Sequence, residues 1–157
     1  MISKKDTERI LKILEKKWGK VSIPKIKNVK IFEIEENKSI LVIDSMVAVL
    51  TANDSILPFL GKAEILHIFP SVTVDSGSKF ICNGAKILRP GIVDFDTFKK
   101  DDIVTVKDEK FKKYLAVGLA LEDSEHAQTL EKGQIINNLH FVGDKFWNAF
   151  KEISFRI

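Results

Sequence analysis

The stretch that decides the fold is VTVDSGSKFICNGAKILRPG, which runs from Val72 to Gly91. A β-branched run, Val72 to Val74, predicts a short strand. Asp75-Ser76 can cap a helix, because a side-chain oxygen accepts a free N–H of the first helical turn. Ser78 to Cys82 has room for little more than a turn and a half, and Asn83-Gly84 tolerates the positive φ that ends helices. The pattern predicts strand, glycine turn, short helix, glycine turn and strand.

The same stretch carries three cations, Lys79, Lys86 and Arg89. Small residues, a helix start and cations gathered this closely suggest an anionic ligand that approaches the backbone. Proteins hold a sugar–phosphate backbone or a strand end in this way. The alternative is that these cations are solvated turn residues, and the stretch alone leaves both interpretations open.

Length and composition set the broad class. A chain of 157 residues forms one large domain or two small ones. With 45% hydrophobic and 30% charged residues, it is typical of a soluble globular protein. No apolar run approaches the ~20 residues needed to span a bilayer, and the charged N-terminus shows no secretory signal. The single cysteine, Cys82, cannot form an internal disulfide. We expect a cytoplasmic protein without a membrane contact.

The net charge of +3 lies in the first part of the chain. Residues 1–70 hold 12 Lys and Arg against 9 Asp and Glu, whereas residues 71–157 hold 13 of each. Between Lys12 and Lys30 lie seven cations, interrupted only by Glu15. This bias permits nucleic-acid binding without requiring it. A broad electrostatic contact, if present, would involve this run; a solvated helix face and loop is the alternative.

Residues 1–70 read as a small α+β unit built on an antiparallel sheet. Apolar residues at helical spacing predict the first helix, and strict alternation predicts the hairpin strands. The predicted boundary with the next unit falls at Pro70-Ser71. The expected elements are a helix over 3–18, strands over 29–35, 39–44 and 46–51, a short helix over 56–60 and a strand over 63–69.

Residues 71–157 read as a small closed barrel, because short strands follow one another at short spacing with turn residues between them. Gly118 lies inside the strongest strand and suggests a bulge or a barrel bend. After the opening stretch, the expected elements are strands over 91–95, 103–107, 114–121 and 134–141, a short helix over 122–131 and a last helical turn over 145–150.

No catalytic or metal-binding motif accompanies these elements. His67, His126 and His140 are far apart in sequence, and Cys82 has no C-x-x-C partner. There is no G-x-S-x-G elbow and no phosphate-binding glycine loop. We therefore expect no catalytic residue, no metal and no cofactor, which leaves recognition as the function. Candidates for stacking on bases are Phe80, Phe141 and His140, with a core role as the alternative for each phenylalanine.

The second half of the chain resembles a PUA domain, the pseudobarrel module named for pseudouridine synthases and archaeosine transglycosylases. The matching motifs are VDSGSKFICNGAKILRPGIV (74–93), DDIVTV (101–106) and AVGLAL (116–121). KGQIINNLHFVGDKFW (132–147) resembles the closing segment of the MCT family of PUA-containing translation factors, related to ligatin. That family places a small α/β domain before the PUA domain, and this short chain resembles an archaeal member. The expected fold is α+β: a small antiparallel N-terminal domain over 1–70 and a PUA β-pseudobarrel over 71–157.

The resemblance implies RNA binding without catalysis. Relatives act on the small ribosomal subunit with a partner that bears a SUI1-type domain, near the tRNA acceptor end, so the implied RNA is tRNA or small-subunit rRNA during initiation or recycling. The alternative is an accessory subunit that targets an RNA-modification enzyme of pseudouridylation or archaeosine synthesis. Most PUA domains have alanine where this chain has Ser78. The RNA-binding residues that the motif implies are Gly77, Ser78, Lys79, Gly84, Ala85, Lys86, Arg89, Pro90 and Gly91.

Overall fold

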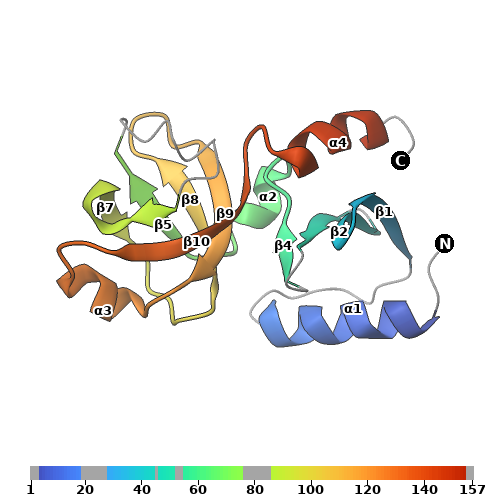
Figure 1. Ribbon diagram of the computed structural model, residues 1–157, viewed down its shortest axis with the longest axis horizontal. Helices are drawn as coiled ribbons and strands as arrows, with labels where there is room; N and C mark the ends of the chain where they lie inside the picture. Colours follow the sequence, from blue (N-terminus) through green and yellow to red (C-terminus); the bar gives the residue numbers. More distant parts are fainter. Residues whose placement is uncertain (1–3, 19–27, 45, 52–54, 76–85, 155–157) are drawn as a thin grey trace.

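The computed structural model describes residues 4–18, 28–44, 46–51, 55–75 and 86–154. It contains two sheets, here called the first sheet, with strand order β1-β2-β3-β4, and the second sheet, with order β6-β10-β9-β8-β5-β7. Figure 1 shows the two sheets side by side, with α1 below the first sheet and α4 above it. None of the described helices is long and apolar enough to cross a membrane.

The first unit combines α1 with an antiparallel meander, as predicted. Helix α1 buries Ile10 and Leu14, and the Nε1–H of Trp18 donates to the backbone oxygen of Ile56 at 2.9 Å. Asn37, at φ 64°, makes the hairpin turn between the first two strands. The predicted helix, hairpin and third strand are confirmed as α1 (Lys4–Lys17), β1 (Val29–Glu35), β2 (Lys38–Ile43) and β3 (Met46–Leu50).

Two predicted elements of the first unit are wrong, because their types are exchanged. The segment predicted as a helix over 56–60 is strand β4 (Ile56–Pro58), which pairs with the edge of β3. The segment predicted as a strand over 63–69 contains helix α2 (Ala63–Leu66). Ile65, Leu66 and Phe69 are buried while the two residues between them are exposed, which is helical rather than alternating spacing.

The second unit is a nearly closed, barrel-like sheet around its own core, and the predicted α+β class with an antiparallel unit and a barrel is confirmed. Strands β5 and β8 run parallel, and the other pairs are antiparallel. The short helix predicted over 78–82 lies outside the described residues. The elements are β5 (Ser71–Val74), β6 (Ile87–Leu88), a 3-10 turn η2 (Arg89–Gly91), β7 (Ile92–Phe95), β8 (Ile103–Asp108), β9 (Tyr114–Ala120), α3 (Ser124–Thr129) and β10 (Gln134–Phe141).

The last helix, α4 (Lys145–Ile153), connects the two units. It is longer than the predicted turn over 145–150, and it packs against β1 and β2 of the first sheet (Figure 1). Its Phe150 ring lies 4.6 Å from the ring of Phe59, between centroids. The division at residue 70 separates the two sheets, but α4 belongs in space to the first sheet although it lies in the second sequence range.

A buried histidine fixes the junction of the units. The backbone N–H of Leu60 donates to Nε2 of His140 at 3.1 Å. Nε2 is therefore unprotonated, and Nδ1–H of His140 donates to Oδ2 of Asp144 at 2.8 Å. The His140 ring also stacks on Phe59, with 5.5 Å between centroids. Because His140 is 0% exposed, it cannot stack on an RNA base, and that candidate role is wrong.

Candidate nucleic-acid interface

The two flanks of the predicted RNA-binding stretch meet at the end of β5. The N–H of Asp75 donates to the backbone oxygen of Gly91 at 2.9 Å. On the other side of β5, the N–H of Glu109 donates to the backbone oxygen of Val74, also at 2.9 Å. The parallel pairing of β5 with β8 aligns Val74 with Asp108. One end of the second sheet thus gathers the end of β5, the η2 turn and the β8–β9 hairpin.

Four of the predicted RNA-binding residues lie in the described part of the chain, namely Lys86, Arg89, Pro90 and Gly91. Lys86 and Pro90 are exposed, whereas Arg89 and Gly91 are half-buried. Arg89, Pro90 and Gly91 together form η2, where proline occupies an early position that tolerates its missing N–H. The other predicted site residues, Gly77, Ser78, Lys79, Gly84 and Ala85, lie outside the described residues, as does Phe80.

Arg89 fastens η2 to the end of α3. Its Nε–H donates to the backbone oxygen of Ala127 at 3.0 Å, and a terminal N–H donates to that of Ile92 at 3.0 Å. The other terminal nitrogen lies 3.5 Å from the oxygen of Gln128. Two of these carbonyls belong to the last turn of α3, where a cation is favourable. The guanidinium also lies 5.0 Å from the ring centroid of Phe95. Arg89 therefore positions the turn, whatever else it contacts.

The packing among the described residues does not require Gly91 to be a glycine. No atom of the described residues lies within 4 Å of a Cβ added there, so these residues leave room for a side chain. A glycine of this kind allows a ligand to approach the backbone closely. Together with exposed Lys86 and Pro90, it gives the η2 turn an accessible backbone and a nearby positive charge.

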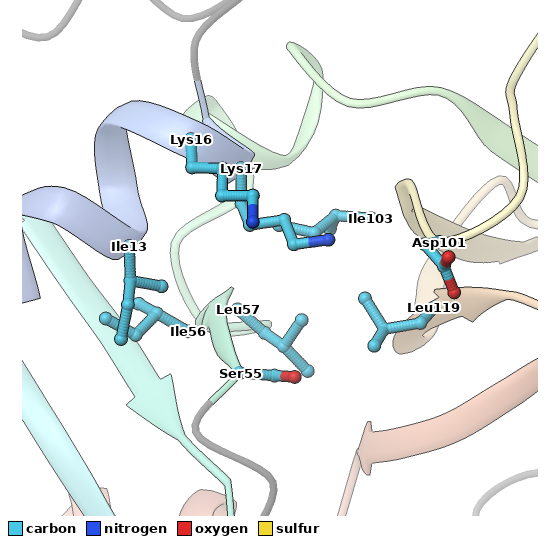
Figure 2. A pocket seen from close by; sticks show the side chains of 9 residues that line it. All are labelled: Ile13, Lys16, Lys17, Ser55, Ile56, Leu57, Asp101, Ile103 and Leu119. Carbon is cyan, nitrogen blue, oxygen red and sulfur yellow. The ribbon is translucent and has the colours of Figure 1, made fainter.

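A separate cleft of about 400 Å³ lies between the two units. Figure 2 shows Lys16 and Lys17 of α1 extending across it toward Asp101 of the second unit. The two lysines belong to the basic run over 12–30, so part of that run faces this cleft. Sequence reasoning missed the cleft, because its lining comes from both units. The apolar lining consists of Ile13, Ile56, Leu57, Ile103 and Leu119.

Within the described ranges, no three His, Cys, Asp or Glu side chains gather closely enough to hold an ion.

At the junction of the units, the hydroxyl of Tyr114 lies 2.8 Å from Nδ1 of His67. Burial, with a smaller effect of Asp96, raises the pKa of Tyr114. This tyrosine is therefore a neutral hydrogen-bonding group at the junction rather than an anion.

Comparison with known proteins matches a family model and several relatives over most of their length. The model described as PUA domain matches residues 70–142. An uncharacterized protein of Methanocaldococcus jannaschii is 40% identical, with 94% of this chain and 93% of the relative covered. Translation machinery-associated protein 20 of Saccharomyces cerevisiae is 28% identical, with 92% and 89% covered. Malignant T-cell-amplified sequence 1 of Rattus norvegicus is 28% identical, with 83% and 76% covered.

Proposed function

The chain belongs to the MCT family of PUA-domain proteins, and from this membership we propose that it binds RNA within the translation machinery and catalyses no reaction. The relative in Saccharomyces cerevisiae is named for its association with that machinery and is covered over 89% of its length. Both units are therefore shared with it, and the role is proposed for the whole chain, in the cytoplasm.

The observation that carries the proposal is the exposed turn at the end of the second sheet. It lies inside the stretch matched by the PUA model. Exposed Lys86 supplies a positive charge, and no described residue lies within 4 Å of a Cβ built at Gly91. Phosphate groups are recognised by cations together with backbone N–H groups. The RNA is the acceptor end of tRNA or small-subunit rRNA, during initiation or recycling, with a SUI1-domain protein as partner.

The test uses Lys86→Ala and measures affinity for tRNA and for fragments of small-subunit rRNA over a salt series. Losing one phosphate contact lowers the slope of log affinity against log salt by about one. Lys86 is the better probe than Arg89, because Arg89 also holds η2 on α3 and its removal disturbs the fold. Lys99→Ala is the control, since this exposed lysine precedes the opposite end of β8.

Two outcomes would contradict this proposal. The first is a wild-type protein without measurable affinity for either RNA at low salt. The second is recovery from cell extract in a stable complex with an RNA-modification enzyme and not with ribosomal subunits. The latter would support the alternative role as an accessory subunit of such an enzyme.

A further inference from the structure

The β8–β9 hairpin ends in a phenylalanine that faces solvent among lysines. Phe111 is 65% exposed, which makes it the most exposed large hydrophobic residue in the described ranges. Lys110, Lys112 and Lys113 beside it are also exposed. A single exposed apolar residue is common and needs no explanation by itself. The combination of an aromatic ring with three adjacent cations is more specific.

Hydrogen bonds hold the backbone of the hairpin tip. Oδ2 of Asp108 accepts the backbone N–H of Phe111 at 2.6 Å. The backbone N–H of Asp108 donates to the backbone oxygen of Lys113 at 2.9 Å. The backbone N–H of Lys112 donates to the backbone oxygen of Asp108, also at 2.9 Å. Lys112 adopts the left-handed conformation, with φ 57°. These bonds hold the backbone that presents Phe111, so little backbone freedom is left to lose when a ligand binds.

The ring of Phe111 has a cation near one face and is otherwise largely exposed. Nζ of Lys110 lies over the ring of Phe111, 5.3 Å from its centroid. With the side chain 65% exposed, a nucleobase can stack on the ring while Lys110 and Lys112 reach the adjoining phosphates. Stacking of bases on aromatic side chains combined with backbone neutralisation is how proteins hold single-stranded nucleic acid.

The tip also lies at the end of the sheet that carries the proposed RNA site. Glu109, next to Lys110, donates its N–H to Val74 at the end of β5. Asp75, one residue further, donates its N–H to Gly91. An RNA strand that leaves the η2 turn in this direction would pass the hairpin tip.

We propose that the β8–β9 hairpin tip is a second RNA contact, in which Phe111 stacks on an unpaired base and Lys110 and Lys112 neutralise its flanking phosphates. This inference rests on the proposed RNA-binding function and names the form of RNA: a single-stranded end or extension rather than a blunt duplex. An anionic membrane surface is the other partner that lysines and an exposed phenylalanine could suit, and the test includes it.

The experiment compares two RNA probes, a hairpin with a single-stranded 3′ overhang and the same hairpin with a blunt end. Phe111→Ala should weaken binding of the overhang probe about 5- to 150-fold, which is the loss of one stacked base, and leave the blunt probe unchanged. Phe111→Leu should lose as much, because leucine is apolar but has no π-face. Phe111→Trp should retain the affinity. Ile68→Ala is the matched control, since Ile68 is 49% exposed and lies in the first unit.

The lysines are tested together. Replacing Lys110 and Lys112 by alanine should lower the salt slope for the overhang probe by about two. The same change at Lys99 and Lys100, before the other end of β8, should leave the slope unaltered.

Several results would overturn the hairpin proposal. One is an equal loss on both probes, and another is the same affinity for Phe111→Ala as for wild type while Lys86→Ala still weakens binding. A third is that Phe111→Ala abolishes binding to vesicles of phosphatidylcholine and phosphatidylserine but not to RNA. Wild-type protein that binds neither probe, nor tRNA or rRNA fragments, would contradict the proposed function itself.

Discussion

Gly118 in β9 and Gly91 in η2 differ in the room that their surroundings leave for a side chain. A Cβ at Gly118 would lie 1.9 Å from the backbone oxygen of Asn137 in β10. The obstacle is backbone, so relief requires β9 and β10 to separate. A Cβ at Gly91 would meet none of the described residues within 4 Å. The fold requires the first glycine, whereas the described neighbours of the second leave room for a side chain.

Gly118→Ala should therefore lower the free energy of unfolding by about 3 kcal/mol, the upper part of the range for overpacked sites. Gly91→Ala should leave it unchanged or raise it by about 0.4–1 kcal/mol, since alanine restricts the unfolded chain. Urea denaturation followed by circular dichroism measures both. Equal stability of the two variants would show that β10 is not held against β9 as described.

The sequence located Gly118 and Arg89 as special residues but not what they contact. The bulge expected at Gly118 occurs on the neighbouring strand, where the register shifts between Asn138 and His140. Arg89 was predicted to bind RNA, and its partners Ala127 and Gln128 lie 38 and 39 residues away. Such contacts depend on the closure of the barrel, which local sequence patterns do not encode.

At the scale of elements, long alternating or periodic segments were predictable and short apolar ones were not. The helix over 3–18, the hairpin and the later strands carry enough residues to distinguish a period of two from one of 3.6. Segments 56–60 and 63–69 are short apolar runs. Their types are decided by the free edge of β3, which pairs with β4, and by the core that receives Leu66 and Phe69.

Helix α4 depends on the residue that precedes it, Asp144, through bonds to residues close to it in sequence. Oδ1 of Asp144 accepts the N–H of Trp147 at 2.8 Å and so caps the helix. Oδ2 accepts both the N–H of Phe141 and Nδ1–H of buried His140, each at 2.8 Å. One carboxylate thus serves the helix and the junction of the units.

Asp144→Ala should cost about 3 kcal/mol, because it removes a cap and leaves the buried Nδ1–H of His140 unpaired. The N-cap of α3, Asp123, is the matched control. Its side chain makes no cap bond and accepts only the exposed N–H of Lys100 among the bonds described, so Asp123→Ala should cost about 1 kcal/mol or less. Guanidinium unfolding followed by tryptophan fluorescence distinguishes them. Similar losses would mean that Asp144 acts merely as a surface charge.

At the scale of the whole molecule, the last helix, α4, contacts the first strand, β1. Nζ of Lys145 in α4 lies 2.6 Å from Glu35 at the end of β1, a separation of 110 residues in sequence. Lys38 lies 3.2 Å from the same carboxylate. The sequence predicted two units and their order, but the docking of α4 on the first sheet required the junction made by His140 and Phe59.

This ion pair predicts how stability changes with pH. Hydrogen bonds first from Lys145 and then from Lys38 hold the pKa of Glu35 below its ordinary value of 4.5. Between the lowered folded pKa and 4.5, the unfolded chain binds more protons, so stability rises with pH in that window. The contribution of Glu35 is complete above 4.5 and disappears as the pH falls through the folded value. Because the carboxylate is exposed, salt should reduce the contribution as well.

Glu35→Gln should therefore be less stable than wild type at neutral pH and low salt, and the difference should close as the pH falls below 4.5 or as salt is added. Glu33→Gln removes an exposed carboxylate from the same strand and controls for the change in net charge. Urea midpoints across the pH series measure the differences. If the Glu35→Gln difference grew toward low pH, the sign of the linkage would be wrong, and the ion pair of Glu35 with Lys145 would not contribute to holding α4 on the first sheet.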